Sequence, residues 1–206
     1  MANELNIDPS TVVTITRQYG SGGRQVAEIL ARKMGVRRYD RKVVAMAAEN
    51  LGGDVDFDEV LERSYNAPEN CTGNIGDYAY ERVPAHNRMY IEQAKVILGI
   101  AKEGGAVFLG RCADYILRDR PKTYSVFIYA NDAFRAARAR SDQYGDISLK
   151  DMDAVDRQRE QYYAYYTGQT WGAPVNYDLM INTSKLSLEA TADLILDYVR
   201  KRQGKE

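Results

Sequence analysis

Short apolar runs alternate along this chain with segments whose apolar residues recur at helical spacing. The first run, Val12 to Ile15, predicts a buried strand, and the spacing from Arg24 to Met34 predicts a helix that Gly35 ends. Comparable apolar runs predict further strands at 106–109, 124–129 and 177–181. Helical spacing predicts further helices at 41–51, 89–102, 132–140, 149–166 and 186–200.

Three segments between these elements show little apolar pattern. Val36 to Asp40 is interpreted as a basic hinge, and Asp56 to Arg63 as a short acidic helix. The segment from Asn66 to Asn87 is rich in proline, glycine and polar residues, which predicts a long irregular loop. Loops of this length inside a compact domain are usually functional or mobile.

Alternating strands and helices indicate an α/β protein with a mostly parallel sheet covered on both faces. In such sheets ligands bind at the carboxyl ends of the strands. Three sequence features follow strands in this chain: a glycine turn after the first, Gly110-Arg111 after the second, and an arginine-rich helix after the third. We expect these features to converge on one crevice.

Composition limits the functions to consider. The chain has 206 residues, with 28 lysines and arginines against 29 acidic residues, so bulk charge gives no reason to expect nucleic acid or a membrane surface as a partner. Cys71 and Cys112 lie far apart and His86 is the single histidine, which argues against a metal site of these residues. The length suits a single domain. Because the N-terminal segment is polar, we expect the protein to be cytoplasmic.

The glycine turn joins the first predicted strand to the first predicted helix. Backbone N–H groups at a helix N-terminus favour a phosphate, so the turn is a candidate phosphate cradle, and a tight turn with only a packing role is the alternative. It is not a complete Walker A motif, which requires a lysine and a hydroxyl. Counted from the glycines, the lysine position is Gly23, and Arg24 and Gln25 follow it.

The order of five segments resembles the cytidylate-kinase-like family, a branch of the P-loop nucleoside monophosphate kinases. These segments are TITRQYGSGGRQVAEILARKMG, YDRKVV, VFLGRCADYIL, FIYANDAFRAARAR and YDLMINTSKLSLE, and the resemblance runs from Val12 to about Val199. It implies a three-layer α/β/α fold with a core of residues 11–35, 104–145 and 175–203. It also implies a helical nucleoside monophosphate-binding insert at about 36–103 and a lid at about 146–174.

The resemblance also implies a reaction, namely phosphoryl transfer from ATP, with magnesium, to a (deoxy)cytidine monophosphate-like acceptor. The residues expected to hold donor phosphates are Gly20, Ser21, Gly22, Gly23, Arg24, Gln25, Arg135 and Arg138. The acceptor residues are Asp40, Arg41, Arg111 and Asp114, with Asp114 on the same helical face as Arg111. Arg24, Arg157 and Arg159 would neutralise charge during catalysis, and no protein metal ligand is assigned.

Several of these side chains have plainer explanations. Arg24 could be an exposed first-turn arginine, Asp40 a helix cap, and Arg111 with Asp114 a local ion pair. Arg135 and Arg138 could belong to a solvated charged face, with Arg138 paired to Asp142. The tyrosines at 162, 163, 165 and 166 could pack in the core or against a partner subunit, and a homodimer is considered for that reason.

The departure from Walker A leaves other functions open. Phosphoryl transfer is catalysed mainly by positioning and charge neutralisation, so loss of the lysine and hydroxyl affects the chemistry more than the fold. One alternative is a catalytically degenerate module that binds a nucleotide or another phosphorylated ligand. Another is a kinase for a different small-molecule acceptor, with specificity in the 66–87 segment. A dinucleotide-binding Rossmann domain is disfavoured because the turn lacks G-x-G-x-x-G.

Overall fold

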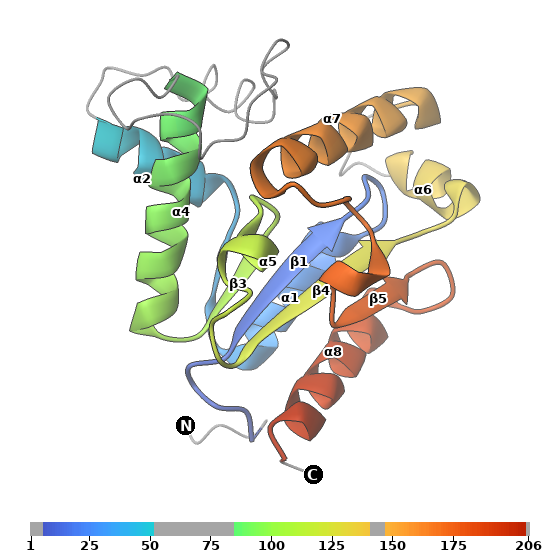
Figure 1. Ribbon diagram of the computed structural model, residues 1–206. Coiled ribbons are helices and arrows are strands. Elements are labelled where there is room, and N and C mark those ends of the chain that lie inside the picture. Colours follow the sequence, from blue (N-terminus) through green and yellow to red (C-terminus); the bar gives the residue numbers. More distant parts are fainter. Residues whose placement is uncertain (1–5, 52–84, 141–146, 205–206) are drawn as a thin grey trace.

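Figure 1 shows the computed structural model of the chain, which describes residues 6–51, 85–140 and 147–204. The predicted acidic helix at 56–63 and nearly all of the predicted 66–87 loop lie outside the described residues. The described residues form a five-stranded sheet of order β2-β3-β1-β4-β5, in which every pair of neighbours is parallel. The strands are β1 (Val12–Arg17), β2 (Arg37–Tyr39), β3 (Ala106–Leu109), β4 (Thr123–Tyr129) and β5 (Leu179–Asn182).

Helices cover both faces of the sheet. Along β1, Val13 and Ile15 face α1 (Gly23–Met34) and α8 (Leu188–Arg202), where they join a core that includes Leu30 and Leu196. Val12 points to the opposite face. That face is covered by α2 (Arg41–Leu51), α4 (Ala85–Glu103) and α5 (Ala113–Ile116). The predicted three-layer α/β/α fold is therefore confirmed.

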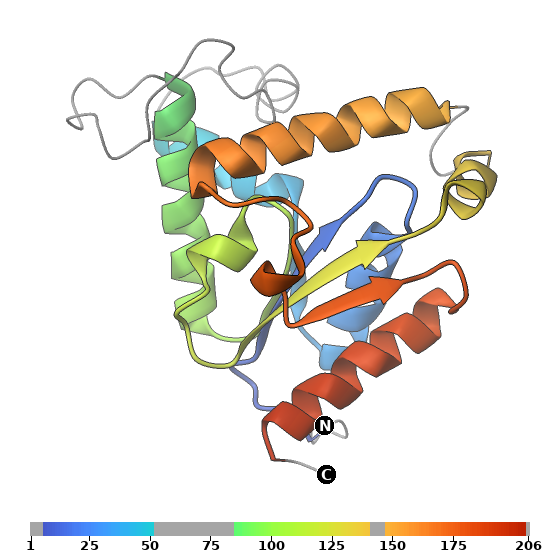
Figure 2. The same cartoon turned by 45° about the vertical axis from the view of Figure 1, so that its right-hand side comes forward.

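Helices α6 (Asp132–Ala139) and α7 (Leu149–Thr167) lie beyond the carboxyl ends of the strands, and Figure 2 shows α7 crossing that end of the sheet. The short η3 (Pro174–Asn176) instead precedes β5 and lies beside Ser125, near the start of β4. Side chains cap α6 and α7, since that of Asn131 accepts from the N–H of Phe134 and that of Ser148 from the N–H of Asp151. Gly168, with φ of 67°, ends α7. The described segment before β1 and the end of α8 lie at the opposite end of the sheet.

At β2 and at the start of α4 the structure differs from the sequence predictions. The hinge predicted at 36–40 is wrong, because residues 37–39 form the edge strand β2, whose Tyr39 pairs with Phe108 of β3. Helix α4 begins at Ala85, before the predicted start at Met89, so Asn87 lies in a helix and not in a loop. Its buried amide donates a hydrogen bond to the hydroxyl of Tyr165 in α7 over 3.3 Å.

Candidate functional site

The glycine turn, Gly20 to Gln25, follows β1 and leads into α1. Gly20 and Gly22 have φ of 77° and 83°, a left-handed conformation that glycine adopts without steric cost. The first turn of α1 contains no acidic residue, so nothing of opposite charge in that turn offsets the positive end of the helix dipole. The local backbone is therefore suited to an anion, as predicted from the sequence.

A neighbouring side chain occupies the space at the position of the Walker lysine. A Cβ atom built on Gly23 would lie 2.6 Å from Cβ and 3.0 Å from Cγ of Arg17, the last residue of β1. Arg17 thus fills the space next to Gly23, and sequence reasoning did not select it. Arg24 is exposed on the first turn of α1, and Gln25 beside it is half-buried.

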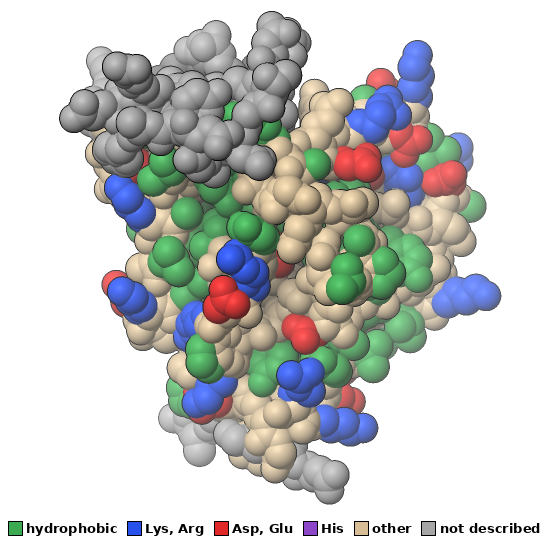
Figure 3. Space-filling view, in the orientation of Figure 1, with side chains coloured by type: hydrophobic (Ala, Val, Ile, Leu, Met, Phe, Trp, Pro, Cys, Tyr) green, Lys and Arg blue, Asp and Glu red, His purple; other side chains and the backbone are tan. Residues whose placement is uncertain are grey.

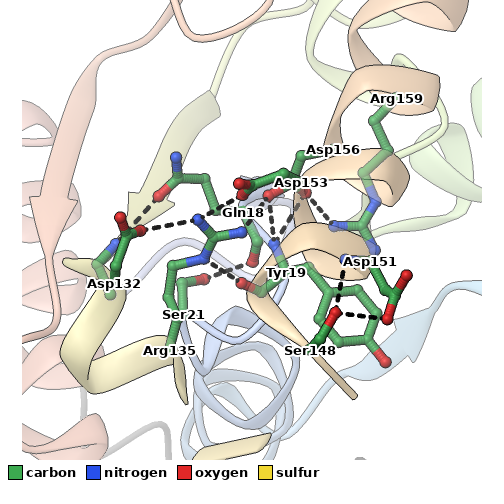
Figure 4. Close-up of polar contacts among 11 residues, drawn as sticks. Gln18, Tyr19, Ser21, Asp132, Arg135, Ser148, Asp151, Asp153, Asp156 and Arg159 are labelled. Atoms are coloured by element: carbon green, nitrogen blue, oxygen red, sulfur yellow. Dashed lines mark hydrogen bonds and ion pairs between the residues drawn. The ribbon is translucent and has the colours of Figure 1, made fainter.

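Residues far apart in the sequence hold the backbone on either side of Gly20, and Figure 4 shows those that bind Tyr19. The N–H of Tyr19 donates to both carboxylate oxygens of Asp156 in α7, over 2.9 and 3.0 Å. The carbonyl of Tyr19 accepts from Nε of Arg135 over 2.8 Å. On the other side, the buried hydroxyl of Thr183, just after β5, donates to the carbonyl of Ser21 over 2.6 Å. The glycine turn is thereby connected to α6, α7 and the end of β5.

Arg135 is a buried structural cation. Its side chain is 4% exposed, so the interpretation of Arg135 as part of a solvated face is wrong. Its Nη1 lies 3.2 Å from Asp132 and 2.9 Å from Asp153, and its Nη2 lies 3.1 Å from Asp156. Because three carboxylates and the Tyr19 carbonyl surround this guanidinium, it holds α6, α7 and the loop together.

Arg138, one turn further along α6, faces the glycine turn. Its Cζ lies 3.3 Å from the place that a Cβ on Gly22 would take. Its alternative partner, Asp142, lies outside the described residues. Figure 3 shows acidic and basic side chains intermingled around α6 and α7. Arg138 therefore adds positive charge beside Gly22 of the glycine turn.

Of the two predicted lid arginines, α7 brings one to the loop. Nη1 of Arg159 donates to Asp156 over 2.9 Å and to the carbonyl of Arg17 over 3.3 Å. Its guanidinium lies 5.5 Å from the centre of the Tyr19 ring. Arg157, two positions earlier, is exposed, because residues two apart lie on different sides of a helix.

Burial raises the pKa of Asp156, against the opposing effects of Arg159, the Tyr19 N–H and Arg135. The carboxylate nevertheless has a cation on either side, which favours its charged form. Sequence reasoning selected two of its neighbours but not Asp156 itself.

A strained turn follows β3. Gly110, Arg111 and Cys112 have φ of 72°, 62° and 54°, and the left-handed conformation is costly for the two residues that have a side chain. Arg111 is only 3% exposed. Helix α5 starts after this turn, so the expectation that Arg111 and Asp114 share one helical face is wrong. Strain of this kind is concentrated at functional sites in proteins.

Asp114 is a buried acid held by α7. Its Oδ2 accepts a hydrogen bond from the hydroxyl of Tyr163 over 2.8 Å. Burial raises the pKa of Asp114 to about 6, even though the hydrogen bond from Tyr163 lowers it. A carboxyl group that titrates near neutrality is typical of ligand sites and active sites.

Asp40 and Arg41 follow β2. Because Tyr39 pairs with Phe108, Asp40 comes to the same edge of the sheet as Gly110. Asp40 is half-buried, with Oδ2 3.7 Å from Nη1 of Arg38. Arg41 is exposed at the start of α2.

The tyrosines of α7 form an aromatic cluster over α4 and α5. Tyr162, Tyr163 and Tyr166 are buried together with Tyr90, and the Tyr90 and Tyr166 rings stack with centroids 4.0 Å apart. The interpretation of these tyrosines as core residues is confirmed. Because they pack within the chain, they give no support to a homodimer.

This sheet order, with a glycine turn after the central strand, is that of the P-loop kinase-like fold. The chain belongs to the cytidylate kinase-like family, whose model matches residues 12–185. No curated protein matches the chain at a significant level.

Solved structures share the fold at low sequence identity. An uncharacterized protein from Eubacterium ventriosum has a TM-score of 0.73 at 23% identity, with 94% of this chain and 99% of that chain covered. A gluconokinase from Sinorhizobium meliloti has a TM-score of 0.54 at 11% identity, with 95% and 94% covered. The Mycobacterium tuberculosis APS kinase, in complex with AMPPNP and APS, has a TM-score of 0.51 at 16% identity, with 94% and 99% covered.

Proposed function

We propose that this protein is an ATP-dependent phosphotransferase whose acceptor is a (deoxy)cytidine monophosphate or a similar pyrimidine nucleotide. The main support for this proposal is that the expected donor and acceptor residues lie at the same, carboxyl end of the sheet. There a left-handed glycine turn flanked by Arg138 and Arg159 lies beside the strand β3 that leads to buried Arg111 and Asp114. Family membership and the kinase-like fold support this assignment.

The donor side fits a chain of phosphates. The N–H groups at the start of α1 would hold the phosphate oxygens, since the turn needs glycine at Gly22 and its first helical turn has no acid. Arg24, Arg138 and Arg159 would neutralise the charge that develops during transfer. Arg157 would reach the phosphates only from the exposed side of α7.

Magnesium fits this site only through the nucleotide. Within the described residues, no three His, Cys, Asp or Glu side chains are grouped to hold a metal ion. Arg24 also stands directly after the lysine position, where a Walker motif has a hydroxyl. When bound, magnesium neutralises phosphate charge, and here it would be held by phosphate oxygens and water.

The acceptor side would use Arg111 for the phosphate and Asp114 for a base amino group or sugar hydroxyl. A guanidinium matches phosphate with two parallel hydrogen bonds, and its burial beside the strand end would fix its direction. Asp40 and Arg41 lie at the neighbouring edge of the sheet and would complete this side.

A second candidate function is nucleotide binding without catalysis. It is favoured by the filled lysine position, because Arg17 leaves no room beside Gly23 for a lysine side chain. A third, supported by the gluconokinase likeness, is transfer to a different small-molecule acceptor.

We propose a cytoplasmic location on the basis of the balanced charge and the family. Across the described residues, no helix is long and apolar enough to span a membrane.

Purified protein tests these three functions together. ADP formation is measured with ATP and magnesium for CMP, dCMP, UMP, AMP, GMP, gluconate and no acceptor, with ATP binding followed by calorimetry. The proposal expects turnover with CMP or dCMP that is lost in Arg111→Ala. Binding without turnover would select the non-catalytic module, and turnover with gluconate alone would select a different acceptor.

A further inference from the structure

The carboxylate of Asp156 joins three parts of the molecule. It accepts from the N–H of Tyr19 with both oxygens, and it lies 3.1 Å from Nη2 of Arg135 and 2.9 Å from Nη1 of Arg159. Asp156 and Tyr19 are 137 positions apart in the sequence. A buried carboxylate between two guanidinium groups and a backbone N–H forms strong, directional hydrogen bonds. The contact therefore fixes where α7 lies relative to the backbone that enters the glycine turn.

The position of this contact distinguishes a fastening role from competition with phosphate. The carboxylate binds Tyr19, which precedes the glycine turn, whereas phosphates would bind N–H groups at the start of α1, from Gly22 onward. Asp156 is 8% exposed and lies among groups of α6, α7 and the loop. It is thus placed beside the phosphate cradle and not inside it.

Arg159 depends on Asp156 for its direction. The two residues are three positions apart on α7, and Nη1 of Arg159 is shared between Asp156 and the carbonyl of Arg17. We infer that Asp156 is a positioning residue that fastens α7 to the loop before the glycine turn and aims Arg159 at the donor phosphates. The consequence for nucleotide affinity rests on the proposed function, whereas the fastening itself does not.

Asp153 provides a matched control. It lies one turn before Asp156 on the same helix, and its carboxylate is 2.9 Å from the same Arg135. It is half-exposed, and its ion pair within the described residues is with Arg135 and not with the loop. Replacing Asp153 removes a carboxylate partner of Arg135 without touching the Tyr19 N–H.

The test compares Asp156→Ala, Asp156→Asn and Asp153→Asn with the wild-type chain. The rate of amide hydrogen exchange at Tyr19 and Gly20 measures how firmly Asp156 holds the loop. Calorimetry gives the affinities for ATP and for inorganic triphosphate, which depend on the orientation of Arg159. In Asp156→Ala we expect exchange at Tyr19 to accelerate by about tenfold or more and both affinities to fall by about tenfold. Asp156→Asn keeps an oxygen acceptor and loses the charge, so smaller changes in the same direction are expected.

Asp153→Asn is expected to leave the exchange at Tyr19 and both affinities within about twofold of the wild type. Unchanged exchange in both Asp156 variants would overturn the fastening. Faster exchange with unchanged affinities, or tighter binding, would overturn the positioning role, because tighter binding means that Asp156 competes with phosphate. If the wild-type chain binds neither probe, the proposed function and the aim of Arg159 fail, and hydrogen exchange alone still decides the fastening. Thermal unfolding of each variant checks the fold, and Asp156→Asn carries the test if Asp156→Ala does not fold.

Discussion

The Cβ atom that Gly23 lacks would lie 2.6 Å from the Cβ of Arg17. Real Cβ atoms do not approach one another this closely, so a side chain at position 23 and the arginine at position 17 exclude each other. The contact involves the root of the Arg17 side chain, which cannot swing away as its flexible end could. Gly23 and Arg17 therefore form a matched pair. The altered Walker sequence lacks the lysine at position 23 and also has an arginine at position 17 that fills the space beside it.

Gly23→Ala is expected to destabilise the protein by about 1–3 kcal/mol, the usual cost of overpacking. In an Arg17→Gly background the same substitution should cost much less, because the Cβ that it meets is gone. Arg17→Ala retains that Cβ and should leave the cost unchanged. Urea unfolding of the five variants gives the coupling free energy, and equal costs in all three backgrounds would contradict the pairing.

Arg24 is predicted to bind donor phosphates. Arg24→Ala should weaken ATP binding by about tenfold, since a charge-assisted hydrogen bond is lost. Arg32 is a suitable control because it is exposed on the same helix and pairs with Glu189 at the surface. Calorimetry should find Arg32→Ala within about twofold of the wild type. Equal effects of the two substitutions would remove Arg24 from the site.

The two arginines of α6 are predicted to act differently. Arg135→Ala should destabilise the fold by about 3–5 kcal/mol, because Asp156 would remain buried without that cation. Arg138→Ala should lower stability less and weaken ATP binding by about tenfold. Chemical unfolding and calorimetry on the same samples separate these roles. A stable Arg135→Ala protein would show that this guanidinium is not the structural cation described above.

The raised pKa of Asp114 is expected to make the stability of the protein depend on pH. Its pKa is about 6 in the folded chain against an ordinary value of 3.8, so the folded state binds more protons between these two values. Stability from this group therefore falls as the pH rises through that window and stays low above it. Asp114→Asn, which can still accept from Tyr163, should be more stable than the wild type at neutral pH by up to about 3 kcal/mol.

This advantage should disappear at about pH 3, below the ordinary pKa of 3.8, where Asp114 is largely protonated in both states. Urea unfolding at about pH 7 and at about pH 3 measures the difference. Asp119→Asn serves as the control, because Asp119 is a highly exposed acid in the same segment. An equal stability difference for Asp114→Asn at both pH values would mean that burial does not raise the pKa as described.

Much of the fold could be predicted because local patterns decided it. The strand, glycine turn and helix at 12–34 follow from apolar spacing and from glycines that adopt positive φ. Strand β2 could not be found this way, since Arg37, Arg38 and Tyr39 have no apolar run and become a strand by pairing with β3. The boundaries of the insert and the lid remain predictions.

The candidate site was harder to predict than the fold. Motif positions selected Arg111, Asp114 and Arg159, which the structure places at the carboxyl end of the sheet. Helical spacing could not tell that Arg135 is buried while Arg157 is exposed, because the partners of Arg135 come from α7 and the loop. Asp156 was missed for the same reason, as its contact with Tyr19 joins distant parts of the sequence.

The proposed phosphoryl transfer is tested by following the phosphoryl group itself. The protein is incubated with magnesium and ATP labelled at the γ-phosphate, together with CMP or dCMP, and the labelled product is identified. We expect label in CDP or dCDP, formed by the wild type and lost in Arg111→Ala. Tight ATP binding with no label in either product, or an Arg111→Ala variant as active as the wild type, would contradict the proposed transfer.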